Sequence, residues 1–336
     1  MWVADHFFGG GRDKSWAVPE VVAVLGAMAQ ATSVLRLGTC VVSLVKRNPA
    51  IVAHAALTLN NLASGRFELG VGTGFGPDLR AFGFDLSSPV GRFEEAIGVI
   101  RRLFDASEEE PASAEGRHFT LRDAFLNVPD TDAPPLHVAA VGRRMLKLTG
   151  DFADGWLPFG LTPELYSEFL SMIKPVRPGF TPGLWLPVFV ERPGEDRGAE
   201  AEATGRLYLS MAPDVLKRIT PQPDDRMTSA TKWSPEAGQE LARRVPSEVA
   251  RAVTLHGSPD RCAETIASFI DAGCRTFVLR ITDPASRIDD AAYLGATALG
   301  SFLSHRQAGT AEYPGTLDDV RMRGQNVENE TRPREG

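Results

Sequence analysis

The strongest constraint on the fold is residues 35–74, a stretch that predicts a strand, a helix and a second strand. Residues 35–45 are apolar and rich in β-branched side chains, as in a parallel strand buried on both faces. Pro49 suits a first helical turn, and apolar residues recur at helical spacing over 51–62. Residues 67–71 return as a strand, which exits into Gly72-Thr73-Gly74. This βαβ unit predicts a parallel α/β enzyme that binds a phosphorylated ligand at its strand ends.

Length and charge narrow the class of protein. A chain of 336 residues is long enough for one large α/β barrel. Hydrophobic residues make up 43% and charged residues 24%, as in soluble globular proteins. The formal net charge of −7 argues against non-specific binding to nucleic acid. Three cysteines without paired spacing favour a reducing compartment, and no apolar run is long enough to span a membrane. We therefore expect a cytoplasmic protein with no nucleic-acid partner.

Strand and helix patterns alternate along the chain. Seven strands are predicted near residues 2, 38, 69, 138, 157, 187 and 278. Helices are predicted over 19–31, 51–62, 89–104, 143–149, 163–174, 260–272 and 289–305. Residues 74–88 are predicted to form a long loop. We expect one domain over 1–305, with a hairpin-bearing insertion at 105–134, a lid or binding insertion at 192–258 and a disordered polar tail over 309–336.

The alternation predicts a (β/α)₈ TIM barrel, and the strand count of seven falls one short of it. The interior spacings are already filled, while the chain opens almost directly on a strand. We therefore expect the barrel to lack its first βα unit at the N-terminus, about 30 residues. Two alternatives are a seven-stranded open barrel and an eighth strand hidden in residues 105–134.

Two kinds of motif lie at predicted strand ends. Asp5 and His6 directly follow the first strand, so they fall on the catalytic face of a parallel barrel. A histidine there can exchange a proton near neutral pH, although the pair could equally hydrogen-bond the barrel rim. Glycines at 72–74 and at Gly142 allow a backbone amide to approach a phosphate, or allow close strand–helix packing. Pro77 breaks the dinucleotide fingerprint G-x-G-x-x-G, and the six scattered histidines do not support a metal site.

Several motifs in fixed order resemble the luciferase-like superfamily of flavin- or deazaflavin-dependent oxidoreductases. They are Trp-Val-Ala-Asp-His at 2–6, Arg-Leu-Gly-Thr-Cys-Val at 36–41, Arg-Asn-Pro-Ala at 47–50, Ser-Gly-Arg-Phe-Glu-Leu-Gly-Val-Gly-Thr-Gly at 64–74, Pro-Val-Gly-Arg-Phe-Glu-Glu-Ala at 89–96, His-Val-Ala-Ala-Val-Gly at 137–142 and Ala-Asp-Gly-Trp at 153–156. Within this TIM-barrel superfamily, the chain is most similar to the coenzyme F420-dependent subgroup, including phthiodiolone ketoreductase-like members.

The resemblance implies a role for each matching residue. It points to His6 as the proton donor or acceptor beside the reactive carbon. It points to a non-prolyl cis peptide behind the cofactor ring at Cys40–Val41. The implied cofactor-binding residues are Asp5, Cys40, Val41, Ser43, Thr73, Gly74, Asp78, Val141, Gly142, Arg144 and Met145.

Two departures from the sugar-phosphate dehydrogenases of this subgroup bear on the substrate. Those enzymes carry a catalytic glutamate where this chain has Phe75, and a tryptophan where it has Gly9-Gly10-Gly11. A phenylalanine cannot relay a proton, so the substitution favours a small hydrophobic carbonyl or alcohol substrate.

The leading hypothesis is therefore F420-dependent hydride transfer to or from a carbonyl or alcohol carbon. One alternative is an FMN-dependent monooxygenase that takes reduced flavin from a partner reductase. Another is a non-catalytic ligand-binding relative with an incomplete barrel. A homodimer is expected from the resemblance.

Overall fold

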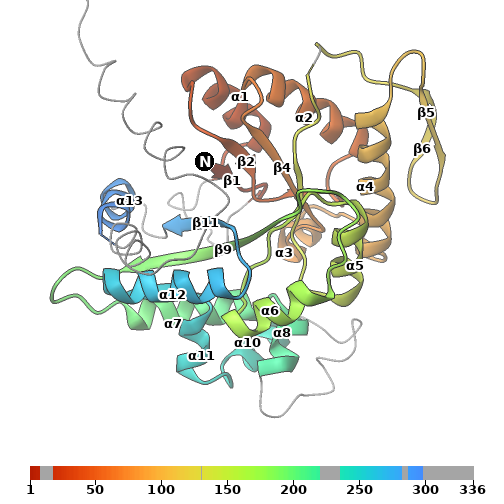
Figure 1. Ribbon diagram of the computed structural model, residues 1–336. Coiled ribbons are helices and arrows are strands. Elements are labelled where there is room, and N and C mark those ends of the chain that lie inside the picture. Colours follow the sequence, from red (N-terminus) through yellow and green to blue (C-terminus); the bar gives the residue numbers. More distant parts are fainter. Residues whose placement is uncertain (8–17, 130, 220–234, 282–286, 298–336) are drawn as a thin grey trace, which may run out of the picture.

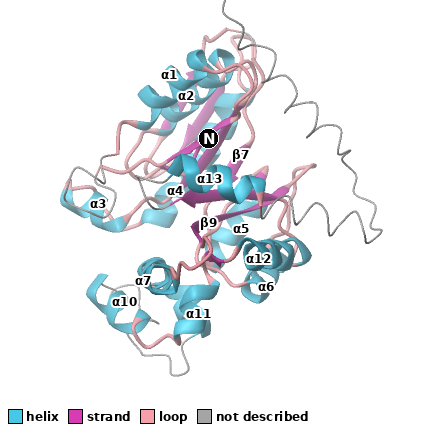
Figure 2. Cartoon of the chain, turned by 90° about the vertical axis from the view of Figure 1, so that its left-hand side faces the viewer, coloured by secondary structure: helices cyan, strands magenta, loops and turns pink. Residues whose placement is uncertain are grey.

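The computed structural model describes residues 1–7, 18–129, 131–219, 235–281 and 287–297. Its centre is a curled nine-stranded sheet in which every recorded strand pair is parallel, with helices packed outside it (Figures 1 and 2). The strands of this sheet are β1 (Trp2–Val3), β2 (Leu37–Thr39), β3 (Val42–Ser43), β4 (Phe67–Gly72), β7 (Leu136–Val138), β8 (Gly155–Trp156), β9 (Thr181–Val190), β10 (Leu255–Gly257) and β11 (Thr276–Ile281).

The helices alternate with these strands, as the sequence predicts. They are α1 (Val21–Ala31), α2 (Pro49–Leu62), α3 (Gly76–Ala81), α4 (Pro89–Asp105), α5 (Arg143–Phe152), α6 (Pro163–Met172), α7 (Gly198–Leu209), α8 (Pro213–Ile219), α10 (Pro235–Ala242), α11 (Ser247–Ala252), α12 (Pro259–Asp271) and α13 (Arg287–Ala296). No helix in the described part of the chain is long and apolar enough to cross a membrane.

Local sequence explains where several helices begin. The helices α2, α6 and α12 each start with a proline, which lacks the N–H that a first turn leaves unpaired. Before these prolines, the side chains of Asn48, Thr162 and Ser258 accept hydrogen bonds from backbone N–H groups of the first turn. These caps fix the helix entries close to the carboxyl ends of the strands.

The sheet runs in the order β1-β2-β4-β7-β8-β9-β10, with β11 also paired to β9 and β3 also paired to β4. Buried side chains such as Leu69, Val71, Val138, Trp156 and Leu186 form the core together with the inner faces of the helices. Among the described residues, no hydrogen-bonded pair joins β1 to β11. The coarse expectation of a parallel α/β fold is confirmed, and a complete barrel is not shown.

The predicted count of seven strands is wrong. The structure has a further parallel strand, β10, which pairs with the end of β9 at Leu255↔Val188. In the sequence, β10 falls inside the insertion expected at 192–258. The other described elements of this insertion are the helices α7, α8, α10 and α11. A three-residue strand of sequence Leu-His-Gly has too short a pattern to detect by periodicity.

The hairpin expected within 105–134 is confirmed. Strands β5 (Ala112–Glu115) and β6 (Thr120–Ala124) pair in antiparallel fashion and form a separate two-stranded sheet at one side of the molecule (Figure 1). The alternative that this segment hides an eighth barrel strand is therefore wrong.

Two local expectations need correction. The strand predicted over 35–45 is divided into β2 and β3, because the cis peptide at Cys40–Val41 interrupts it. The loop predicted over 74–88 contains the short helix α3, which starts with Gly76 and Pro77 at its first two positions. The tail expected over 309–336 lies outside the described residues.

Candidate active site

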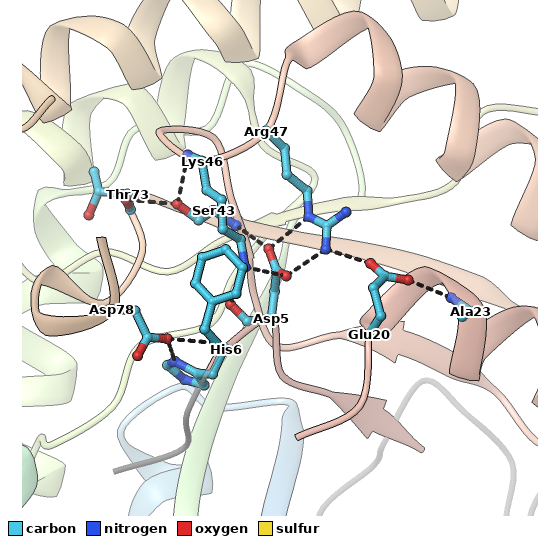
Figure 3. Close-up of polar contacts among 10 residues, drawn as sticks. Asp5, His6, Glu20, Ala23, Ser43, Lys46, Arg47, Thr73 and Asp78 are labelled. Atoms are coloured by element: carbon cyan, nitrogen blue, oxygen red, sulfur yellow. Dashed lines mark hydrogen bonds and ion pairs between the residues drawn. The ribbon is translucent and has the colours of Figure 1, made fainter. Parts of the chain in front are cut away.

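The candidate site lies where β1, β3 and β4 end. Asp5 and His6 directly follow β1, Ser43 ends β3, and Thr73 follows β4. The carboxyl ends of neighbouring parallel strands share one edge, so these residues converge (Figure 3). The structure therefore brings together the motifs that the sequence analysis took from three separate segments.

Asp5 is a buried anion with every carboxylate lone-pair direction engaged. Its Oδ1 accepts hydrogen bonds from Lys46 Nζ at 2.6 Å and from Arg47 Nη2 at 2.7 Å. Its Oδ2 accepts from Arg47 Nε at 3.0 Å and from the Ser43 backbone N–H at 3.2 Å. Burial by itself would raise the pKa of Asp5, but the hydrogen bonds and charges of Arg47 and Lys46 outweigh it and hold that pKa below its ordinary value. Asp5 is therefore an ionised anchor that ties β1 to the segment after β3.

The hydrogen-bond network around Asp5 continues to helix α1. Arg47 also donates to Glu20 Oε1 at 2.6 Å, and the other oxygen of Glu20 accepts from the Ala23 N–H at the start of α1 (Figure 3). The sequence analysis missed Lys46 and Arg47 as partners of Asp5. A signal was present, because two adjacent cations follow shortly after β3 at the same edge of the sheet as Asp5.

The two ring nitrogens of His6 differ, because Nδ1 contacts a carboxylate. Its Nδ1 lies 2.9 Å from Asp78 Oδ2, and its side chain remains 34% exposed. The ring packs edge-on against Phe75, with ring centroids 5.5 Å apart. A carboxylate oxygen can only accept a hydrogen bond, so in this contact Nδ1 donates and Nε2 is the nitrogen that can exchange a proton with a ligand.

Asp78 is 3% exposed and comes from the first turn of α3. Its Oδ2 also accepts from the Phe7 backbone N–H at 3.0 Å. Its Oδ1 is buried and has no hydrogen-bond partner among the residues that the structure describes. A buried acceptor of this kind is available to a ligand donor, as expected for a polar contact to a cofactor ring.

Backbone lies unusually close to backbone beneath these side chains. A Cβ added to Gly70 would lie 2.0 Å from the Thr39 carbonyl oxygen, and one on Gly72 would lie 2.9 Å from Val41 Cγ2. Gly74 has a φ of +91°, and a Cβ there would lie 2.3 Å from Ser43 Oγ. These glycines let β4 pack directly against residues 39–43 at the edge of the site, and this close-packed stretch is called the glycine floor below.

The peptide Cys40–Val41 is cis, as the resemblance implies. Ser43 Oγ donates to the Thr73 carbonyl at 3.1 Å and so joins the end of β3 to the exit of β4. Burial raises the pKa of the Cys40 thiol to about 12, so this thiol stays neutral and is not a nucleophile. Together with the glycine floor, these residues fit a planar heteroaromatic cofactor.

The predicted cofactor-binding residues at 141–145 lie in different environments. Gly142 caps the N-terminus of α5, and a Cβ there would lie 2.8 Å from Asp214 Oδ2. Val141 and Met145 are largely buried, and Val141 lines a small cavity of about 90 Å³. Arg144 is exposed and pairs with Glu94 of α4. The structure therefore places Arg144 on the surface beside α4, while Gly142 and Val141 remain at the end of β7.

An aromatic wall that the sequence analysis did not identify as part of a site is formed by Phe159, Trp185 and Tyr208. The rings of Trp185 and Tyr208 lie 4.7 Å apart, those of Phe159 and Tyr208 lie 6.0 Å apart, and Arg280 donates to the Tyr208 hydroxyl. Burial raises the pKa of Tyr208, and the nearby charge of Arg280 opposes that rise. Tyr208 comes from α7, so the insertion contributes a side chain toward the sheet.

A second group of rings, Phe7, Phe82 and Phe84, lies beside His6 and is called the aromatic cluster below. Phe7 stacks on Phe82 with centroids 4.0 Å apart and on Phe84 with centroids 6.2 Å apart. Lys46 Nζ lies 4.4 Å from the Phe7 ring centroid. Phe82 is 56% exposed and Phe7 is 42% exposed, so an apolar surface adjoins the candidate proton donor.

The chain is similar in sequence to a known family and to named enzymes. The profile of a family described as luciferase-like monooxygenase matches residues 1–276. A phthiodiolone/phenolphthiodiolone dimycocerosates ketoreductase of Mycobacterium tuberculosis is 32% identical over 273 residues, which cover 73% of this chain and 69% of the relative. An F420-dependent glucose-6-phosphate dehydrogenase of Kineococcus radiotolerans is 30% identical over 285 residues, which cover 81% of this chain and 80% of the relative.

Comparison of structures points to the same fold. A solved F420-dependent secondary alcohol dehydrogenase in complex with an F420-acetone adduct matches with a TM-score of 0.70 at 23% sequence identity. The match covers 88% of this chain and 89% of the other. At this identity, the likeness shows the fold alone.

Proposed function

The chain belongs to the luciferase-like monooxygenase family, and from this premise we propose that it is a coenzyme F420-dependent oxidoreductase acting on a carbonyl or alcohol carbon. Two relatives at 30% identity or more are named as a ketoreductase and as an F420-dependent dehydrogenase. The observation that carries the proposal is His6, held by Asp78 with Nε2 open, beside a glycine-floored strand edge.

The bound deazaflavin would supply the hydride chemistry. In carbonyl reduction the substrate carbon gains a hydride, and its oxygen gains a proton from Nε2 of the protonated His6, which gives an alcohol and a neutral imidazole. In alcohol oxidation the same nitrogen takes the hydroxyl proton. His6 therefore acts as general acid in one direction and as general base in the other.

The proposed cofactor-binding residues are those implied by the resemblance. Ser43, Thr73, Gly74 and the Cys40–Val41 peptide border the glycine floor. Oδ1 of Asp78, which has no hydrogen-bond partner among the described residues, supplies a buried acceptor. Asp5 would act mainly by fixing the Ser43 backbone, since its own oxygens are occupied. Val141, Gly142, Arg144 and Met145 complete the proposed set, with Arg144 as its most exposed member.

The proposed substrate is a small hydrophobic ketone, aldehyde or alcohol. Phe75, which cannot carry a proton, packs against His6 where the sugar-phosphate dehydrogenases carry a catalytic glutamate. The aromatic cluster extends apolar surface outward from His6. These contacts favour an apolar substituent on the reacting carbon over a phosphorylated sugar.

The proposal includes an eight-stranded barrel as the frame of the site, supported by the parallel sheet and the structural likeness. It also includes a cytoplasmic homodimer and a partner reductase that regenerates the reduced cofactor.

The test is anaerobic turnover by the full chain. Reduced F420 is mixed with methyl ketones of increasing chain length, and in a separate assay oxidised F420 is mixed with glucose 6-phosphate. The absorbance of oxidised F420 is followed in both. We expect this absorbance to rise with the apolar ketones, as the cofactor is oxidised, and to stay constant with the sugar phosphate, because no cofactor is reduced. Oxygen consumption with reduced FMN, and no turnover with F420, would replace the proposal with a monooxygenase. Binding of F420 without turnover of any substrate would favour a non-catalytic relative.

A further inference from the structure

The carboxylate of Asp78 has a second feature besides its free oxygen. It comes from a helix 72 residues away from His6 in the sequence, yet it meets Nδ1 at 2.9 Å from a position that is 3% exposed. The same oxygen accepts the Phe7 N–H, which fixes the backbone directly after His6. Asp78 thus holds both the ring of His6 and the peptide that carries it.

We propose that Asp78 is a positioning residue for His6, which keeps the proton of the neutral ring on Nδ1 and turns Nε2 toward the reacting oxygen. This assignment rests on the proposed function for the role of Nε2. A carboxylate offers only acceptor oxygens, so a hydrogen bond to it requires the proton to stay on Nδ1. Without such a partner, a neutral histidine ring prefers to carry its proton on Nε2, where it could not accept one from an alcohol.

Most of the charged groups near Asp78 and His6 are paired with other residues. Lys46 and Arg47 come from the segment after β3, and both bind Asp5. Arg80 lies on α3 itself, and Glu20 is bound to Arg47. Among the described residues, the only recorded ion-pair partner of Asp78 is His6. A negative charge in this position also favours the protonated ring, which is the form that donates in carbonyl reduction.

Phe75 also contacts the ring of His6. The two rings meet edge-on with an interplanar angle of 85°, so the imidazole contacts both a carboxylate and an aromatic ring. These two contacts come from the exit of β4 and from α3, which are adjacent in the sequence. The segment 75–78 therefore orients His6 as a unit.

The first test measures the proton directly in cofactor-free full-length protein. Long-range ¹H–¹⁵N NMR of the histidine rings distinguishes the two neutral tautomers, and the His6 signals are those lost in His6→Gln. We expect the Nδ1–H tautomer in the wild-type chain and the Nε2–H tautomer in Asp78→Ala. Asp85→Asn, which removes an exposed carboxylate that binds only Ser87 among the described residues, is the matched control and should leave the wild-type tautomer unchanged.

The second test uses the loaded enzyme and Asp78→Asn, which keeps the size of the side chain and removes its charge. We expect the pH profile of carbonyl reduction to change in Asp78→Asn, because the substitution removes the negative charge beside Nδ1 of His6, and to stay as in the wild type in Asp85→Asn.

A wild-type His6 with its proton on Nε2 would overturn the proposal even if Asp78→Ala failed to fold. An identical tautomer in wild type and Asp78→Ala would also overturn it. The NMR result does not depend on F420. If the wild-type chain has the Nδ1–H tautomer and binds no F420, the proposed function is rejected while the role of Asp78 in positioning His6 is retained.

Discussion

At the scale of single residues, the site depends on two aspartates with different tasks. Asp5 is saturated by Lys46, Arg47 and the Ser43 N–H, so it stabilises the strand ends. Asp78 uses one oxygen on His6, and its other oxygen has no hydrogen-bond partner in the described part of the chain. The chemistry therefore falls to His6, because it is the group in this cluster that can both donate and accept a proton near neutral pH.

Substitution His6→Gln should lower kcat for hydride transfer by about 10²- to 10⁴-fold, because a glutamine cannot exchange the proton. The dissociation constant for F420 should change little, since the cofactor-binding residues remain. His54→Gln, at an exposed histidine of α2, is the control and should keep wild-type kcat. Steady-state rates with a methyl ketone measure both variants. Wild-type kcat in His6→Gln would remove His6 from the reaction.

The adjacency of Asp5 and His6 after a short apolar run was enough to predict a strand-end pair. The partners of the pair were harder to predict, because Asp78 and Arg47 lie 72 residues from His6 and 42 from Asp5. Such separations carry no periodic signal, and only the order of strands brings them together. The resemblance identified Asp78 as part of the site, but its hydrogen bond to His6 required the structure.

At the scale of elements, the exit of β4 determines the shape of the site. Gly70 and Gly72 let β4 approach the backbone at Thr39 and the side chain of Val41, and Gly74 turns the chain next to Ser43. These glycines are needed for close approach, so a side chain would displace the Cys40–Val41 segment or Ser43. The floor of the site is therefore a property of one strand and its neighbour.

Two glycine substitutions separate this steric effect from backbone strain. Gly74 and Gly83 both have positive φ, +91° and +73°, but nothing lies within 4 Å of a Cβ on Gly83. Gly83→Ala should cost about 1–2 kcal/mol in the free energy of unfolding, from backbone strain alone. Gly74→Ala should cost clearly more, because its Cβ also meets the Ser43 side chain, and it should weaken F420 binding. Denaturant titrations compare the two, and equal losses would contradict a tight contact at Gly74.

Element prediction succeeded where the apolar pattern was long. The helices α1, α2, α4 and α12 lie within a few residues of their expected bounds, since each has a long run of helical spacing. Shorter elements failed: β10 has three residues, and α3 has six within a stretch rich in glycine and proline. The split of β2 from β3 depends on the single peptide Cys40–Val41, which no hydrophobic pattern encodes.

At the scale of the whole molecule, Asp154 connects three parts of the chain. Its Oδ2 accepts from the Leu136 N–H at 2.8 Å and from Arg101 of α4 at 2.7 Å, and its Oδ1 accepts from Arg177 at 2.6 Å. Burial alone would raise the pKa of Asp154, but hydrogen bonds from Leu136 and from the two arginines hold it below its ordinary value of 3.8. Asp154 thus links β7, α4 and the approach to β9.

This network predicts how stability depends on pH. Because the pKa of Asp154 is lower in the folded than in the unfolded chain, its contribution is full well above pH 3.8 and is lost as pH falls toward the folded value. Asp154→Asn should therefore destabilise the chain at neutral pH and reduce the loss of stability on acidification below about pH 4. Asp151→Asn, at the partner of Lys147 on α5, is the control and should change little. Urea unfolding at several pH values tests this, and parallel curves for wild type and Asp154→Asn would contradict it.

The central claim for the whole molecule is that it holds F420 against the edge formed by β1, β3 and β4. The most direct measurement is equilibrium binding of the full chain to oxidised F420 and, separately, to FMN, by isothermal titration calorimetry. We predict saturable F420 binding at least about tenfold tighter than FMN binding, a difference of about 1.4 kcal/mol. We also predict that Gly74→Ala weakens it while Gly83→Ala does not. Absence of F420 binding to the folded chain, or tighter binding of FMN, would contradict the account.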